Sequence, residues 1–196
     1  MSSGDDPPKL LDEERRCIDD ARRGDRQAFA ALVERYWDRL YRWLYRLTRD
    51  RHLAEDLTQE AFLKALAHLE TFRAGSNFQA WLFRIAHNSW VNHARRPGHG
   101  PHGHEPHVFP EHLPGRDEGP LETVVSRECL QLLARAVGRL PAEFRAAFLL
   151  RAEEGLSFRQ IGEVLGLTEE TARWRVFKAR QKLLSALAPQ LEHEDR

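Results

Sequence analysis

Apolar residues recur along the amino-terminal half of the chain at spacings of three and four, which places their side chains on one face of an α-helix. The pattern is almost unbroken over residues 27–48, and it is repeated over residues 10–23, 53–72 and 77–95. No run of alternating apolar and polar residues with flanking turn signals, typical of a strand, stands out. The pattern therefore predicts a helical amino-terminal half with almost no β-structure.

The helical pattern stops after residue 95 and resumes near residue 121. Proline, glycine and histidine dominate the sequence between these points, a composition typical of a flexible linker. We therefore expect an all-α protein with two small helical domains and a disordered linker between them. The expected segments are a tail with the first helix, a first domain, the linker, a second domain and a C-terminal tail, at residues 1–24, 25–96, 97–120, 121–188 and 189–196.

The second half begins with a helical pattern over residues 122–138, and Pro141 then occupies a position typical of the first turn of another helix. Ser157 and Gln160 match an S-x-x-Q capping box, which predicts a short helix after Ser157. Gly166 follows as a turn signal. Two short helices joined by a glycine turn are expected, which is the pattern of a helix-turn-helix.

The last helix, which Thr168 can cap, has two unlike faces. Small and aliphatic residues at spacings of four, three and four are expected to be buried: Ala172, Val176, Ala179 and Leu183. The other face suits the major groove of DNA, with Thr171, Arg173 and Trp174 toward the bases and Arg175, Lys178 and Arg180 toward phosphates. Basic residues on a helix are often only solvated surface, which is the simpler interpretation of this face taken alone.

The composition limits the other possibilities. The 30 basic and 30 acidic residues give a formal net charge of zero, so affinity for nucleic acid must come from local segregation of charge. The two cysteines, Cys17 and Cys129, are far apart and form no Cys-x-x-Cys motif, so neither a zinc ribbon nor a disulfide framework is indicated. The acidic start of the chain does not resemble a secretory signal, and no apolar run is long enough to span a bilayer. We expect a cytoplasmic protein without membrane insertion.

One helical segment, residues 53–72, has an acidic outer face. Its polar residues opposite the apolar stripe are Glu55, Asp56, Gln59 and Glu60. An acidic face cannot lie on phosphates, but it can dock on a basic protein surface. The alternative is that these residues are only a solvated helix face.

The next segment, residues 77–95, combines aromatic, basic and amide side chains on its outer face. Aromatic rings stack on unpaired bases, arginines bind phosphates and amides read base edges, so this face suits single-stranded DNA. The polar loop before it, residues 72–77, suits an extruded base. The candidate residues are Phe72, Asn77, Phe83, Arg84, Asn88, Trp90, Arg95 and Arg96. Most aromatic residues of a small helical domain are core residues, and among the aromatics Phe83 and Trp90 are expected to be exposed.

Three stretches together resemble a known family: "AEDLTQEAFLKA", "FRAGSNFQAWLFRIAHNSWVNHARR" and "LSFRQIGEVLGLTEETARWRVFKARQKL". They resemble regions 2.2, 2.3–2.4 and 4.2 of extracytoplasmic-function sigma factors of bacterial RNA polymerase, in the same order. The resemblance covers nearly the whole chain outside the N-terminal tail and the linker. It implies a dissociable subunit that binds core RNA polymerase, directs it to promoters and assists strand opening.

The resemblance also implies roles for individual residues. Asp56, Gln59 and Glu60 would bind the clamp helices of the polymerase β′ subunit, and the β subunit would be a second contact. The loop before residue 78, with Asn88 and its neighbours, would bind the −10 element, and the last helix would read the −35 element. Trp174 departs from the family pattern, in which a small or polar residue is common. An anti-sigma protein is implied as a further partner.

Two other functions remain possible from the residues alone. The first is a free-standing helix-turn-helix transcriptional regulator. The second is a metal-responsive interaction protein that uses the linker histidines, His99, His102, His104, His107 and His112. Tight metal binding is not expected from these histidines without nearby cysteines or a rigid scaffold. No glycine-rich phosphate loop, nucleophile elbow or His-Glu-x-x-His motif is present, so we expect no catalytic residue, no cofactor and no enzyme activity.

Overall fold

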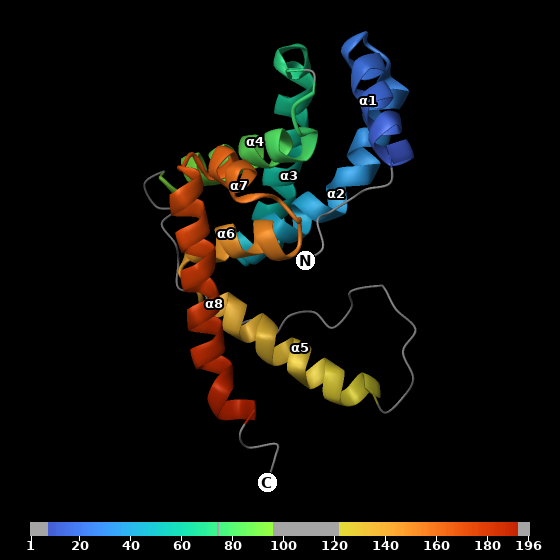
Figure 1. The fold of residues 1–196 in the computed structure, drawn as a ribbon. Helices are drawn as coiled ribbons and strands as arrows, with labels where there is room; N and C mark the ends of the chain where they lie inside the picture. The colour runs from blue at the N-terminus through green and yellow to red at the C-terminus, as the bar shows by residue number, and fades with distance from the viewer. Residues whose placement is uncertain (1–7, 74, 96–121, 192–196) are drawn as a thin grey trace.

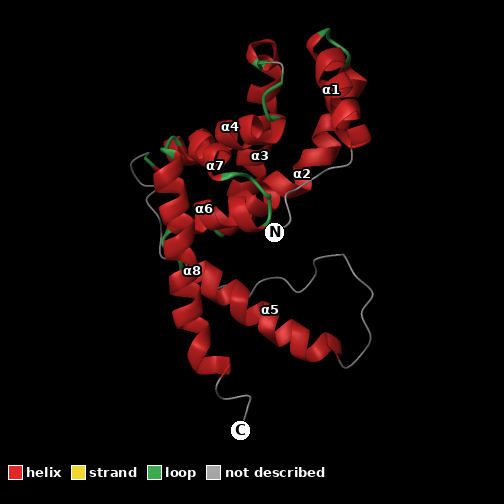
Figure 2. Ribbon diagram, viewed as in Figure 1, coloured by secondary structure: helices red, strands yellow, loops and turns green. Residues whose placement is uncertain are grey.

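The computed structural model describes residues 8–73, 75–95 and 122–191, and every regular element in these ranges is helical (Figures 1 and 2). The amino-terminal helices are α1 (Pro8–Arg22), α2 (Arg26–Thr48), α3 (Arg51–Ala67) and α4 (Phe78–Ala94), with a 3₁₀ turn, η1 (Leu69–Thr71). The carboxyl-terminal helices are α5 (Glu122–Arg139), α6 (Ala142–Ala152), α7 (Phe158–Leu165) and α8 (Glu169–Leu191). The all-α prediction is confirmed. Helix α8 continues three residues past the predicted domain end at 188, while Arg96 and the linker histidines lie outside the described residues.

Side-chain caps fix where the amino-terminal helices begin. Asp25 accepts hydrogen bonds from the backbone nitrogens of Gln27 and Ala28 at the start of α2. Asp50 caps α3 in the same way, and the side chain of Asn77 accepts from the backbone nitrogen of Ala80 at the start of α4. Each cap satisfies backbone N–H groups that have no partner within the first turn.

Helix α2 is the centre of the amino-terminal unit, because α1, α3 and α4 all pack against it. Its fully buried residues include Leu40, Trp43 and Leu44, which follow the predicted apolar stripe. Alanines on α3, such as Ala54 and Ala61, are completely buried and let α3 lie close to its neighbours. The unit therefore has one continuous core, in which large side chains from α2 pack against alanines and against Leu57 and Phe62 of α3.

The carboxyl-terminal unit contains the predicted helix-turn-helix. Ser157 and Gln160 form both hydrogen bonds of the capping box, at 3.3 and 2.8 Å. Gly166 ends α7 in the left-handed region, with φ of 68°. A Cβ on Gly162 would lie 2.7 Å from the carbonyl oxygen of Leu167, so only glycine fits there. The predicted inner stripe of α8 is buried as expected, at Ala172, Val176, Ala179 and Leu183.

The two units pack against each other in this structure. Helix α7 lies along α4, and α6 lies beside α2, whereas α5 and the C-terminal half of α8 project away from the amino-terminal helices (Figure 1). The contact includes the turn after α6, where Glu154 is 8% exposed although it is a carboxylate. The sequence pattern predicted a linker between two domains, and it contained no signal for this packing.

Candidate protein and nucleic-acid interfaces

The outer face of α3 carries the predicted acidic residues. Glu55, Asp56, Gln59 and Glu60 are all exposed. Glu60 is also part of a small network: its carboxylate lies 2.5 Å from Lys64 Nζ and accepts from the Ser89 hydroxyl of α4 at 3.1 Å. Glu55, Asp56 and Gln59 therefore form the part of this face that is open to a partner, while Glu60 also ties α3 to α4.

Two leucines extend the acidic face, and the sequence analysis did not select them. Leu63 is 68% exposed and Leu66 is 50% exposed, both one or two turns after Glu60 on α3. Exposed leucines at the end of a charged helix face are typical of a protein-binding surface more than of a nucleic-acid one. Both are apolar residues at positions outside the predicted apolar stripe of α3. Apolar residues on the polar face of a predicted helix are the sequence signal that would have identified them.

The outer face of α4 carries part of the predicted single-strand site. Arg84, Asn88 and Arg95 are exposed. Trp90 is half-buried, and its ring lies 5.7 Å from the imidazole of His87. Asn77 is exposed at the start of the helix, where its side-chain oxygen already serves as the cap. Cationic and amide groups thus share one side of α4, while Trp90 packs on His87 away from it.

The expected exposure of Phe83 is wrong. Phe83 is fully buried, and its ring lies 5.3 Å from that of Trp43 on α2. Phe72 is also buried, at 3% exposure, with Phe78 and Trp81 at 5.5 and 5.2 Å. Phe83 is a core residue because α4 packs against α2 and α3, and Phe72 is one because the loop before α4 folds its ring onto Phe78 and Trp81. Neither ring can stack on a base while the fold is intact.

His87 lies where α4 meets the carboxyl-terminal unit. Burial, with a smaller contribution from the positive charge of Arg175, lowers the pKa of its imidazole to about 4. The imidazole is therefore neutral near pH 7. Its Nδ1 atom is buried without a hydrogen-bond partner, as is the indole nitrogen of the adjacent Trp43.

The outer face of α8 keeps the predicted basic and aromatic residues at the surface. Arg173, Trp174 and Arg180 are exposed, while Thr171, Arg175 and Lys178 are half-buried. Arg173 is held over the Phe158 ring and pairs with Glu169 at 2.8 Å. Among the described residues, Arg175, Lys178 and Arg180 form no ion pair, so the helix presents cations outward.

Two aromatic rings of α8 stand out from the surface. Trp174 is 51% exposed, and its inner edge packs 5.7 Å from Phe144 of α6. Phe177, three residues later, is 54% exposed and was not among the candidate DNA-binding residues. Exposure of two large rings on a basic helix provides apolar surface for contact with bases or their methyl groups.

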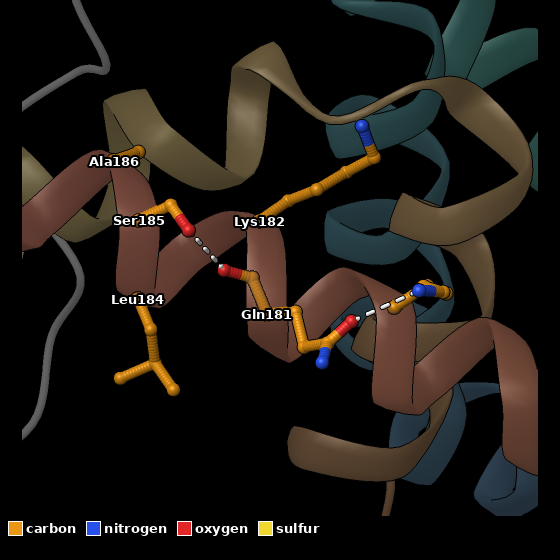
Figure 3. A pocket seen from close by; sticks show the side chains of 6 residues that line it. Gln181, Lys182, Leu184, Ser185 and Ala186 are labelled. Atoms are coloured by element: carbon orange, nitrogen blue, oxygen red, sulfur yellow. Dashed lines mark hydrogen bonds between the residues drawn. The ribbon is translucent and has the colours of Figure 1, made fainter.

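A surface hollow follows the C-terminal half of α8 (Figure 3). It is lined by Lys178, Gln181, Lys182, Leu184, Ser185 and Ala186. Lys178 donates to the side chain of Gln181 at 3.1 Å, and Ser185 donates to the Gln181 carbonyl at 3.0 Å. The described lining comes from one helix, and its polar groups satisfy one another, so we assign no ligand to it.

Within residues 8–73, 75–95 and 122–191 no group of three or more His, Cys, Asp or Glu side chains is arranged to hold a metal ion. Among the helices of the same ranges, none is long and apolar enough to cross a membrane.

The geometry so far defines a class: an all-helical protein with a helix-turn-helix, a second helical unit with a basic and aromatic face, and an acidic face for a protein partner. Comparison with known families agrees with it. Residues 32–99 match the model of sigma-70 region 2, and residues 130–183 match that of sigma-70 region 4.

Related proteins extend the match to most of the chain. The chain is 34% identical over 186 residues to the RNA polymerase sigma-H factor of Pseudomonas aeruginosa, covering 92% of this chain and 96% of that protein. It is 36% identical over 168 residues to the extracytoplasmic-function sigma factor SigE of Mycolicibacterium smegmatis, covering 84% of this chain and 65% of that one.

A solved structure has the same fold. It is the sigma factor RpoE of Bartonella quintana in complex with the anti-sigma factor NepR, with a TM-score of 0.64 and 27% identity over 82% of this chain and 96% of that one. The chain belongs to the sigma-70 family and to its extracytoplasmic-function group. It is a promoter-directing sigma factor of RNA polymerase, as the sequence predicted.

Proposed function

We propose that the three faces divide the work of transcription initiation. The acidic face of α3 binds the clamp helices of the β′ subunit, with the β subunit as a second contact of the core enzyme. The outer face of α4 binds the unpaired strand of the −10 element, and α8 reads the −35 element as duplex. The expected domains, residues 25–96 and 121–188, are the two units that carry these roles.

Segregation of charge is the observation that supports this proposal most directly. Glu55 and Asp56 are exposed on α3, whereas the exposed charges of the outer face of α4 are Arg84 and Arg95. A chain of zero net charge therefore offers one face that repels phosphates and others that attract them. One molecule with such faces suits a protein and a nucleic acid as simultaneous partners.

For DNA binding, we propose a revised set of −10 residues. It omits Phe72 and Phe83, whose rings are buried, and keeps the exposed or half-buried groups of α4 and its preceding loop. The set is Asn77, Arg84, Asn88, Trp90, Arg95 and Arg96, of which Arg96 lies outside the described residues. The −35 set remains Thr171, Arg173, Trp174, Arg175, Lys178 and Arg180.

Binding both elements requires the two units to separate. The element names place the sites about 25 base pairs apart, or about 85 Å along B-DNA. The 26 residues from 96 to 121 can span at most about 90 Å when fully extended. The length of the chain between the units is therefore sufficient for each unit to reach its own element.

An anti-sigma protein is the further partner that we propose. The related sigma factor RpoE forms a complex with the anti-sigma factor NepR, and its fold resembles the compact arrangement seen here. A partner that holds the units together would keep α4 and α8 away from their promoter elements. As a subunit of RNA polymerase, the protein works in the cytoplasm, and catalysis belongs to the polymerase.

Core binding can be tested by reversing charge on α3. The variant Glu55→Lys/Asp56→Lys avoids Glu60, which pairs with Lys64. We expect its affinity for core polymerase to fall at least tenfold and promoter-dependent run-off transcription to be lost. The matched control is Glu13→Lys/Asp19→Lys on α1, where both residues are also exposed. Equal affinity of the two variants for core polymerase would reject the α3 docking face.

The alternative functions gain no support. A free-standing helix-turn-helix regulator would bind duplex DNA and give no transcript with core enzyme, so the same run-off assay distinguishes it. A metal-responsive protein would depend on linker histidines such as His102 and His104, which lie outside the described residues. Calorimetric titration with Ni²⁺ and Zn²⁺ tests that function.

A further inference from the structure

A row of arginines follows one face of α2. Arg39, Arg42 and Arg46 are spaced three and four residues apart, which is the spacing of one helix face, and Arg49 follows as the residue that ends α2 in the left-handed region, with φ of 58°. The seven-residue rise from Arg39 to Arg46 is about 10 Å of helix, so these arginines form a linear cationic surface of that length. The core and DNA contacts proposed above do not use these residues.

Two glutamates from the other unit lie on this row. The Glu154 carboxylate accepts from Arg39 Nε at 2.9 Å, and Glu153 pairs with Arg46. Both glutamates come from the turn that follows α6, which we call the acidic turn (residues 153–154). The acidic turn therefore places two carboxylates against a row of guanidinium groups.

The row has more positive charge than the acidic turn neutralises. Arg42 is exposed and donates to the backbone carbonyl of Asp38 at 3.1 Å. Burial lowers the pKa of Arg46, and the nearby charge of Arg42 contributes. Burial likewise lowers the pKa of Arg145, on α6, to about 10, with a contribution from Arg49. The arginines repel one another, so the surface favours a ligand with several negative charges.

The row is also continuous with the start of α4. Gln79, in the first turn of α4, donates to the same Glu154 carboxylate at 2.7 Å and to the Glu154 carbonyl at 3.3 Å. Groups from α2 and α4 thus converge on one anionic group. Gln79 lies on the side of α4 that faces the carboxyl-terminal unit, so this point becomes accessible together with the arginines when the acidic turn leaves.

We propose that the arginine row of α2 is a binding site for the phosphates of single-stranded DNA, and that the acidic turn occupies it as an internal mimic in the compact form. Guanidinium groups bind carboxylate and phosphate oxygens with the same forked geometry, so one can replace the other. The assignment to DNA rests on the proposed function of α4. Separation of the two units then exposes the site when a strand becomes available.

Neutralising the acidic turn tests the proposal in the full-length protein without polymerase. The variant Glu153→Gln/Glu154→Gln keeps oxygen acceptors for Arg39 and Arg46 but removes two charges. We expect its Kd for a fluorescein-labelled thymidine oligonucleotide of about 20 nucleotides, measured by fluorescence anisotropy, to fall at least tenfold. The matched control, Glu143→Gln/Glu163→Gln, removes two exposed carboxylates of the same unit and should change Kd less than threefold.

A second variant shows whether the gain comes from the arginine row. Adding Arg39→Ala/Arg46→Ala to the neutralised turn leaves no buried carboxylate without a partner, so the fold should survive, as circular dichroism will show. The gain in affinity should disappear, and the salt dependence of binding should weaken by about 1.4, at about 0.7 for each lost phosphate contact with a single strand.

Three results would overturn the proposal. The first is an unchanged affinity for the oligonucleotide when the acidic turn is neutralised. The second is an increase in affinity that persists without Arg39 and Arg46. The third is that polyglutamate competes as strongly as unlabelled oligonucleotide of equal charge. The last would assign the row to an acidic protein. Core polymerase is absent from these oligonucleotide-binding assays, so a negative result in them says nothing about docking of α3 on the polymerase. Likewise, if the α3 variant binds core polymerase normally, the oligonucleotide-binding assays can still be interpreted.

Discussion

Helices α4 and α8 have similar sequences of aromatic and basic residues, yet they use their aromatic residues differently. In α4, Phe83 is fully buried, whereas Trp174 and Phe177 of α8 are about half exposed. The difference follows from the neighbours of each helix: α4 lies between α3, α2 and α7, while the first turns of α8 leave one side to solvent. A mixed aromatic and basic pattern therefore indicates a DNA-binding face only where few helices cover it.

Truncating one aromatic residue in each helix should give the largest contrast. Phe83→Ala removes a fully buried ring and should lower the free energy of unfolding by about 3–5 kcal/mol. Phe177→Ala removes a ring that is 54% exposed and should change it by less than about 1 kcal/mol. Urea denaturation followed by circular dichroism measures both. Equal losses for the two variants would show that the rings are equivalent and that the contrast is wrong.

The elements of each unit were predictable because their signals are local. The helix ranges, the capping box at Ser157 and the buried stripe of α8 all follow from residues within a few turns of one another. The burial of Phe83 was not predictable in this way. It depends on the packing of α4 against α2, where Trp43 lies 40 residues earlier in sequence, and no single-sequence pattern indicates that contact.

The second prediction concerns a titratable group that α4 buries, the imidazole of His87. The pKa of His87 is lowered to about 4 from 6.5, first by burial and then by Arg175. Above pH 6.5 the imidazole is neutral in both the folded and the unfolded chain, so the stability is fully present. As the pH falls from 6.5 toward 4, the unfolded chain binds a proton that the folded chain does not. This should reduce the free energy of unfolding by about 2–3 kcal/mol.

The variant His87→Phe isolates this contribution. Phenylalanine keeps an aromatic ring between Trp43 and Trp90 and cannot bind a proton. Its free energy of unfolding should change less between pH 6.5 and 4 than that of the wild type, because other groups titrate alike in both proteins. Denaturation at a series of pH values measures the difference. Parallel pH profiles would mean that His87 is not desolvated in the folded chain.

The third prediction concerns Trp174 of α8, whose loss should weaken DNA binding and leave stability nearly unchanged, the opposite of what is expected for Phe83 of α4. Trp174→Ala should leave the free energy of unfolding within about 1 kcal/mol of the wild type, because the ring is 51% exposed. Affinity of the polymerase holoenzyme for duplex −35 DNA should fall by roughly 1–3 kcal/mol, the usual effect of one lost base-pair contact. Gel-shift titration gives the affinity. A stability loss with unchanged DNA affinity would make Trp174 a core residue, like Phe83.

The candidate site was only partly predictable for the same physical reason. Exposed charges such as Asp56 and Arg84 were placed correctly, because charged side chains stay in water unless they have a partner. Glu154 is the exception: it is buried by pairing with Arg39, 115 residues earlier. Nothing near Glu154 in the sequence predicts that partner. Leu63 and Leu66 were not predicted because an apolar residue is expected in the core, although both lie outside the apolar stripe of α3 and are exposed.

The smallest effects concern single phosphate contacts on α8. Arg175→Ala and Lys178→Ala should each reduce the salt dependence of holoenzyme binding to duplex −35 DNA by about 0.9. Arg135→Ala, an exposed arginine on α5, is the matched control and should leave the slope unchanged. Arg175 is the sharper test, because it is half-buried beside α4 in the compact form and becomes accessible to DNA only after the units separate. A normal slope for Arg175→Ala with a reduced one for Lys178→Ala would mean that Arg175 stays beside His87 and away from DNA during promoter binding.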